Sequence, residues 1–128
     1  ELGRDWNAVA RQNMLNPTDK PAVSHVEAML TGTTGPVIAA TDYVRLFAEQ
    51  IRPAIQNTGK RYTVLGTDGF GRSDTREQLR HFFEVDRRWV TVAALKTLAD
   101  EGQIEHKKVA EALKKYGLDP KKPNPMTV

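Results

Sequence analysis

The chain has 128 residues, of which 39% are hydrophobic and 27% are charged, and its formal net charge is +3. These values are ordinary for one globular domain, and no stretch is long and apolar enough to cross a bilayer. The absence of cysteine excludes disulfides, thiolate metal ligands and a cysteine nucleophile, and it fits a reducing compartment. We therefore expect a cytoplasmic protein with no membrane partner.

Most basic residues alternate with acidic ones, as on a solvated surface. A small excess of lysine occurs near the C-terminus, at Lys107-Lys108, Lys114-Lys115 and Lys121-Lys122. A nucleic-acid-binding surface needs a denser basic face with aromatic residues within it. We favour solvated lysines over a polyanion site and expect no nucleic-acid partner.

The first fifteen residues carry apolar side chains at helical spacing: Trp6, Val9, Ala10 and Met14. This start has neither an initiator methionine nor a signal-peptide pattern, so we expect it to continue from upstream residues. Pro17 and Pro21 interrupt the helix, and Ser24 is placed to cap a short second helix that runs to Leu30.

Two apolar runs predict buried strands. Val37–Ala40 is continuously apolar, and Tyr62–Leu65 is rich in β-branched and aromatic residues. Between them, Thr41 or Asp42 is placed to cap a helix with apolar positions every three or four residues, until Pro53 interrupts it. A strand, a helix and a strand in this order predict two parallel neighbouring strands.

A glycine-containing loop follows the second strand. Asp74 and Glu77 are three residues apart, which is the spacing of a capping box, so a helix is expected to begin there. Its apolar stripe consists of Leu79, Phe82 and Phe83, and its outer face of Arg76, Arg80 and Glu84.

Two further helices are expected. Asp86 can cap a helix that runs to about Asp100, with Gly102 ending it, and apolar residues on two sides of this helix indicate burial between layers. The last helix runs from about His106 to Tyr116 and ends at Gly117, before a tail with three prolines.

Two parallel strands do not make an independent sheet, because fully apolar strands need neighbours and cover on both faces. We therefore predict an α/β fold that is incomplete on its N-terminal side, with residues 1–128 forming most of one domain truncated upstream. The open apolar edge predicts that the isolated chain is unstable or associates.

The glycines of Gly66-x-x-Gly69-x-Gly71 lie between a strand and a helix, where a phosphate could bind. Their spacing matches neither the dinucleotide fingerprint nor the Walker loop, so we favour a simple turn. We retain the loop as a possible interdomain or anion-contact segment, made of Asp68, Gly69, Phe70, Gly71, Arg72, Ser73 and Asp74.

Asp42 and Asp68 each follow a predicted strand, so both should lie at the edge of the sheet where ligands usually bind. A paired metal or proton-transfer site is possible there, but we favour a cap or turn role for each. The three histidines lie on different helices, and no serine, histidine and aspartate group is evident. Trp6 and Trp89 are interpreted as packing anchors. We assign no catalytic, cofactor-binding or metal residue.

The run GTDGFGRSDTREQLRHFFEVD, with AATDYVRLFAEQIRP before it and WVTVAALKTLADEG after it, resembles the C-terminal end of homodimeric bacterial pyruvate dehydrogenase first components. The resemblance covers nearly the whole chain. More broadly, Phe70-Gly71-x-Ser73 followed by Leu79, Phe83 and Asp86 is similar to the last domain of transketolases.

This resemblance implies an α/β/α sandwich with a mainly parallel sheet, in an enzyme that uses thiamine diphosphate and Mg²⁺. It implies decarboxylation of pyruvate and reductive acetylation of the lipoyl groups of dihydrolipoyl acetyltransferase. In that family the cofactor belongs to the preceding domains, so this segment is expected to contact the other domains of its polypeptide and the homodimer partner.

Overall fold

The computed structural model describes all 128 residues. The strands are β1 (Val37–Ala40) and β2 (Tyr62–Leu65), which have the predicted bounds. The helices are α1 (Leu2–Leu15), α2 (His25–Leu30), α3 (Arg45–Glu49), α4 (Arg52–Asn57), α5 (Arg76–Phe82), α6 (Arg87–Asp100) and α7 (His106–Tyr116). None of these helices combines the length and the apolar character that crossing a bilayer requires.

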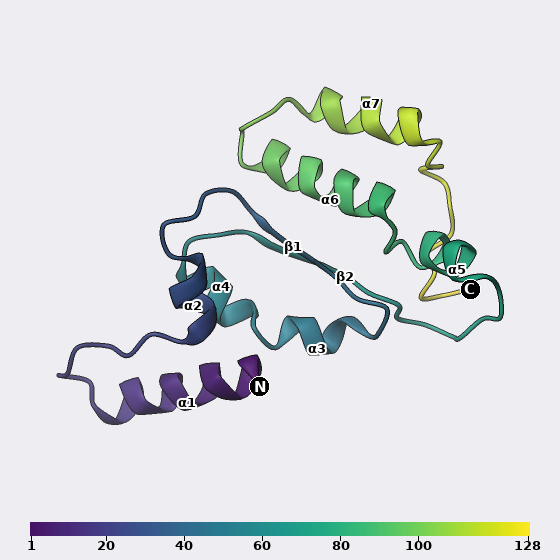
Figure 1. The fold of residues 1–128 in the computed structure, drawn as a ribbon. Helices are drawn as coiled ribbons and strands as arrows, with labels where there is room; N and C mark the ends of the chain where they lie inside the picture. The colour runs from purple at the N-terminus through teal and green to yellow at the C-terminus, as the bar shows by residue number, and fades with distance from the viewer.

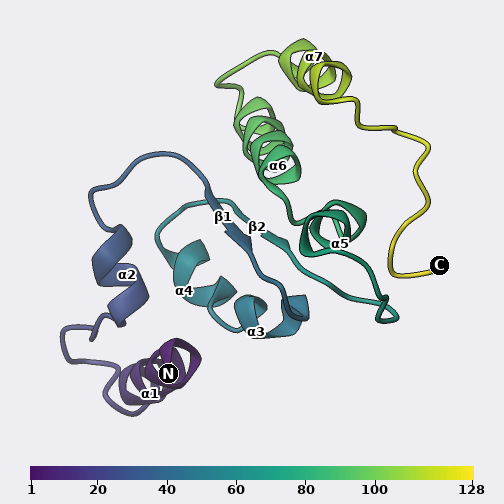
Figure 2. The ribbon, with the colours of Figure 1, turned by 45° about the vertical axis from the view of Figure 1, so that its right-hand side comes forward.

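The two strands pair in parallel, with Val37 opposite Tyr62 and Ala40 opposite Leu65. They lie in the middle of the molecule, with α2, α3 and α4 on one side and α6 on the other (Figures 1 and 2). The helix α1 lies beyond the first group and α7 lies beyond α6. The predicted α/β/α arrangement is confirmed, and it is small because each strand has only one neighbour.

Two hydrophobic clusters hold these layers together. The first joins the sheet to α2 and α4, and Trp6 of α1 packs against it; its buried members are Val26, Ala54, Ile55, Tyr62 and Val64. The second lies between α6, α7 and the residues that follow, and Trp89 packs against it; its buried members are Val92, Ala99, Val109, Ala112 and Leu118. Both tryptophans are packing anchors, as predicted.

Several helix ends follow directly from local sequence. Ser24 and Glu27 form a capping box at the start of α2, and the Asp86 carboxylate accepts hydrogen bonds from the Arg88 and Trp89 amides at the start of α6. Gly117 ends α7 in the left-handed conformation, with φ of 64°. These three predictions are confirmed.

The predicted helix between the strands is wrong in two respects. It is divided into α3 and α4, and Pro53 lies in the first turn of α4, where the missing amide costs nothing. Neither Thr41 nor Asp42 caps α3. The N-cap is Val44, which has no capping side chain, and the Thr41 hydroxyl accepts instead from the Tyr43 amide at 3.1 Å.

The predicted start of α5 is also wrong, by one residue. Thr75 is the N-cap, and its hydroxyl accepts from the Gln78 amide. Asp74 instead accepts a hydrogen bond from the amide of Thr75 at 2.7 Å, so it belongs to the loop. The apolar stripe of α5 is only half-buried, because neither hydrophobic cluster includes this helix.

Candidate functional site

The glycine loop, defined here as Gly66–Asp74, leaves the carboxyl end of β2 and crosses the segment that follows β1. The Thr67 amide donates to the Tyr43 carbonyl at 2.9 Å. A Cβ atom on Gly66 would lie 2.9 Å from both the Tyr43 carbonyl oxygen and the Arg45 amide nitrogen. The two connections approach so closely that only glycine fits at this position.

Asp68 fixes the next part of the loop by a contact with α3. Its carboxylate accepts from the side chain of Arg45 at 2.7 Å and from the Arg45 backbone amide at 3.3 Å. The amide is one of the unpaired donors at the start of α3, where Val44 supplies no capping group. Asp68 therefore acts as a distant cap for this helix.

Gly69 lies against the C-terminal segment of the chain. Its φ is +107°, and a Cβ atom there would lie 2.7 Å from the carbonyl oxygen of Pro125 and 3.0 Å from Met126 Cα. Pro125 is buried by this contact region. Both the backbone conformation and the close approach require glycine.

The tip of the loop points into solvent. Phe70 is 79% exposed, and the residues from Gly71 to Asp74 are exposed as well. The guanidinium of Arg72 lies 4.2 Å from the centre of the Phe82 ring, a distance at which a cation is attracted to an aromatic face. The loop thus holds an unburied aromatic side chain between two glycines.

A cavity of about 370 Å³ lies between the loop and α5. Three guanidinium groups line it, from Arg72, Arg76 and Arg80, and Leu79 and Phe83 supply its apolar surface. Arg80 is paired with Asp42 through two hydrogen bonds, of 3.1 and 2.6 Å. The hydrogen bond from Arg80 lowers the pKa of Asp42, so this carboxylate is charged at neutral pH.

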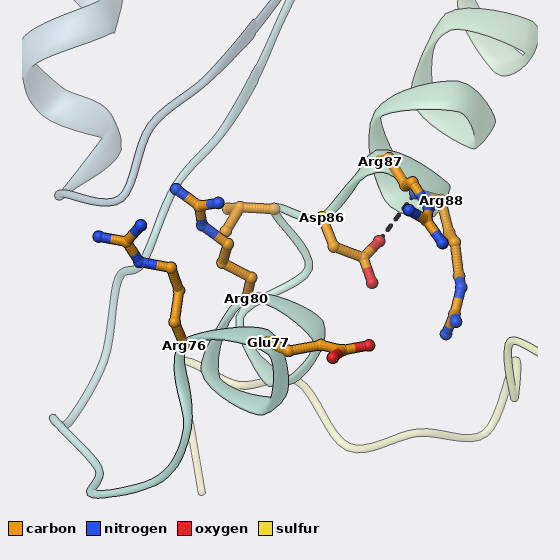
Figure 3. Close-up of a pocket in the computed structure, with 7 residues that line it drawn as sticks. Arg76, Glu77, Arg80, Asp86, Arg87 and Arg88 are labelled. Carbon is orange, nitrogen blue, oxygen red and sulfur yellow. Dashed lines mark hydrogen bonds between the residues drawn. The ribbon is translucent and has the colours of Figure 1, made fainter.

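A second cavity, of about 510 Å³, lies between α5 and the start of α6 (Figure 3). Arg76 and Arg80 extend toward one side of it, and Arg87 and Arg88 lie on the other. Two carboxylates, of Glu77 and Asp86, lie between these pairs. Because the positive groups do not converge, this hollow is a mixed-charge surface and not a single anion site.

The structure places Asp42 and Asp68 at the same end of the parallel strands, as predicted. Each carboxylate pairs with its own arginine, Asp42 with Arg80 and Asp68 with Arg45. The two acids therefore form no shared site, and the chain contains no group of three or more residues arranged to hold a metal ion.

One of the three histidines, His81, lies beside the loop tip, where it lines a cavity of about 420 Å³ together with Ser73 and Asp74. His81 contacts Asp86 and His106 contacts Asp100, each at 3.0 Å, whereas the His25 amide donates to Asp5. Neither ring contact includes a serine or threonine that a histidine could activate. Ser73 and His81 line one cavity, but no hydrogen bond joins their side chains, so the structure pairs no nucleophile with a base.

Sequence reasoning missed the residues that hold the loop from a distance. Arg45, Arg80 and Met126 each contact the loop or its surroundings from another part of the chain. Their partners lie 23, 38 and 81 residues away along the chain. No local motif signals such contacts. The spaced prolines of residues 119–125 restrict the backbone of the tail, but they do not indicate which residues the tail contacts.

Comparison with known families supplies the identity of this domain. The model of the transketolase-like TK C-terminal domain matches residues 5–86, which is more than half of the chain. The chain belongs to this family. The matched residues include both strands and the whole glycine loop, whereas α6 and α7 lie beyond them.

Curated relatives are similar over the whole transketolase-like chain. A pyruvate dehydrogenase E1 component of Cupriavidus necator is 67% identical over 128 residues, which cover 100% of this chain and 14% of that protein. The corresponding protein of Pseudomonas aeruginosa is 61% identical over 126 residues, and that of Escherichia coli 49% over 125 residues. Both alignments cover 98% of this chain and 14% of the relative, so the chain spans about one seventh of their length.

Proposed function

We propose that this chain is the C-terminal domain of a pyruvate dehydrogenase E1 component. The observation that carries the proposal is 67% identity along the entire chain to a protein of that name. The complete enzyme would be a cytoplasmic homodimer that decarboxylates pyruvate with thiamine diphosphate and Mg²⁺. It would then transfer the acetyl group to the lipoyl groups of dihydrolipoyl acetyltransferase within a multienzyme complex.

We propose further that this domain supports the enzyme without touching the reacting atoms. The donor set does not fit a magnesium diphosphate group, because Asp42 and Asp68 are each engaged by an arginine and no third ligand lies with them. This observation supports the proposal that the other domains of the polypeptide hold the cofactor.

The glycine loop is the part of the domain best suited to contact the remaining polypeptide or the partner subunit. Phe70 is 79% exposed on a loop that Asp68 and Gly69 fix in place. Exposed aromatic side chains on fixed supports are typical anchors of interfaces. Unpaired strand edges on β1 and β2 provide a second place where upstream residues would join the domain.

A domain exchange tests the proposal. The matching segment of the Cupriavidus necator E1 component is replaced by these 128 residues, and pyruvate-dependent acetylation of lipoyl groups is measured in the reassembled complex. We expect activity within about threefold of the parent, because two thirds of the residues are identical. A well-folded chimera that binds thiamine diphosphate but lacks activity would contradict the proposal. The parent enzyme without the segment serves as the negative control.

The isolated chain provides the complementary experiment. We expect no pyruvate-dependent dye reduction by the 128 residues alone, even with thiamine diphosphate and Mg²⁺ present, because no donor set or nucleophile is assembled. Turnover by the isolated chain would show that its role is catalytic.

A second candidate function is the binding of an anion, such as a phosphorylated metabolite, beside the glycine loop. The 370 Å³ cavity favours it, because three arginines line this space and only Arg80 has a carboxylate partner within the chain. Calorimetry with inorganic phosphate and a sugar phosphate, on the wild type and on Arg72→Ala, tests this function. Anion binding is supported if the wild type gives a saturable heat of binding that the Arg72→Ala variant loses. It is rejected if both proteins give equal and negligible heats.

A further inference from the structure

The segment that follows α7, here called the tail (Asp119–Val128), returns to the glycine loop. Figures 1 and 2 show it passing from the end of α7 to the neighbourhood of α5, on the side where the loop leaves β2. The tail thus connects the α6–α7 layer with the edge of the sheet, although it contains no helix or strand.

Lys122 anchors the first half of the tail to the end of α5. Its ammonium group donates to the Phe82 carbonyl and to the Glu84 carboxylate, each at 2.8 Å. The same group lies 5.2 Å from the centre of the Phe82 ring and 5.6 Å from that of Trp89. Its side chain is only 19% exposed, so these contacts are partly shielded from water and are stronger than surface pairs.

Met126 and Pro125 anchor the second half directly on the loop. The Pro125 carbonyl and Met126 Cα cover Gly69 so closely that a single added Cβ would collide with them. The sulfur of Met126 contacts the guanidinium group of Arg45. Because that guanidinium also donates to Asp68, one side chain holds the tail and the loop together.

The tail is shaped for this path by its own sequence. The side chain of Asn124 accepts from the Met126 amide at 3.0 Å, and its carbonyl accepts from the Thr127 amide at 3.0 Å. Prolines at positions 120, 123 and 125 restrict the unfolded tail, which lowers the entropy lost on docking. A flexible tail would not be expected to keep two separate anchors.

We propose that the tail is a strap that fixes the conformation of the glycine loop and so sets the position of Phe70. Lys122 binds one end of the strap to the end of α5, and Pro125 and Met126 pack against Gly69. Between these anchors the strap has little freedom, so the loop stays closed against α3. The role of Phe70 at an interface with another domain or subunit rests on the proposed function. The link between the tail and the loop does not depend on that function.

Hydrogen exchange measured by mass spectrometry on the full polypeptide that carries this chain tests the link. Three variants each weaken the strap: Lys122→Met removes the ammonium group, Met126→Ala removes the contact with Arg45, and Gly69→Ala obstructs docking. We expect the Thr67 amide, which bonds the Tyr43 carbonyl, and the Arg45 amide, which bonds the Asp68 carboxylate, to exchange at least about tenfold faster in each variant, as local opening becomes easier.

Matched controls are available in the same segments. A Cβ atom added to Gly71 would meet no atom within 4 Å, and the φ of Gly71 is not positive, so Gly71→Ala should leave loop exchange unchanged. Lys121 is exposed and its side chain makes no hydrogen bond or ion pair, so Lys121→Met is the control for Lys122→Met. Unchanged exchange in Lys122→Met and Met126→Ala would overturn the strap, whatever the behaviour of Gly69→Ala.

A further variant separates this inference from the proposed function. Phe70→Ala should leave loop exchange as in the wild type, because the side chain is outside the strap contacts. If the loop contacts another domain or subunit, the same variant should weaken assembly of the enzyme. Normal assembly with Phe70→Ala would reject the interface role of Phe70, while the exchange results with the tail variants would still decide the strap.

Discussion

Asp86 satisfies three donors with one carboxylate. One oxygen accepts from the Arg88 amide at 2.8 Å and the Trp89 amide at 3.1 Å, and the other lies 3.0 Å from Nδ1 of His81. Burial raises the pKa of Asp86, but the amide bonds and His81 outweigh it, so the pKa is lowered from its ordinary value of 3.8. The charged carboxylate is therefore part of the folded state of α6.

Removing this cap gives a pH-dependent prediction. Asp86→Ala should ease the opening of α6 by about 1 kcal/mol near neutral pH, the usual cost of losing an N-cap. Because the folded pKa is the lower one, the charged form contributes fully above the unfolded pKa and loses its contribution as pH falls through the folded pKa. The difference from wild type should therefore shrink below the ordinary value of 3.8.

Amide exchange at Arg88 and Trp89, measured from neutral to acidic pH, checks this expectation. Asp86→Asn is the control, since its amide oxygen still accepts both backbone bonds but carries no charge. A cost for Asp86→Ala that stays constant below the ordinary value of 3.8 would contradict the role given to the charge.

At the scale of elements, α5 depends strongly on its N-cap residue. It has seven residues, belongs to neither hydrophobic cluster, and is capped by Thr75, whose hydroxyl lies 3.3 Å from the Gln78 amide. A short helix with little buried surface has few other sources of stability.

We expect Thr75→Ala to destabilise α5 by about 0.5 to 1 kcal/mol, because the capping oxygen is lost. Asp74→Ala should cost clearly less, since Asp74 bonds only the adjacent Thr75 amide. Local exchange of the α5 amides in the two variants measures the difference. A larger effect from Asp74→Ala would show that the sequence-based assignment of the cap was the right one.

The elements also show what local sequence can predict. Ser24, Asp86 and Gly117 act within four residues of their own positions, and their roles were correctly predicted. The start of α3 was not, because its unpaired Arg45 amide is satisfied by Asp68 from 23 residues away. Helix periodicity likewise could not show that Pro53 opens α4 instead of only ending its predecessor.

In the candidate site, too, local features could be predicted from the sequence and long-range contacts could not. The glycine positions and the common edge of Asp42 and Asp68 followed from the strand and loop pattern. Their partners did not, since the pairing of Asp42 with Arg80 depends on where the loop places α5 relative to the segment that follows β1. Long-range packing decides such contacts, and a single sequence contains no period or spacing that encodes them.

The molecule as a whole exposes unpaired strand edges and a group of large apolar side chains. Both strands have an edge without a neighbour, and α3 and the residue before its N-cap present three large apolar side chains to solvent: Tyr43, Leu46 and Phe47, which are 62%, 68% and 59% exposed. The rings of Tyr43 and Phe47 lie 5.2 Å apart, so these residues form one continuous patch.

We therefore expect the isolated chain to self-associate as its concentration rises, in sedimentation velocity experiments. The double variant Leu46→Ser with Phe47→Ser should reduce this association, because it removes most of the apolar patch. Val23→Ser, at a side chain that is 59% exposed and lies outside the patch, is the control. A chain that stays monomeric and melts sharply would contradict the prediction and would indicate a self-sufficient fold.

The contact between Gly69 and the tail also has a consequence for biosynthesis. A growing polypeptide emerges from the ribosome starting at its N-terminus, so residues 66–74 are made well before residues 122–126. The bond between Lys122 and Glu84 and the cover over Gly69 cannot form until those later codons have been translated. The contacts that fix the glycine loop are thus completed only after the tail has been made.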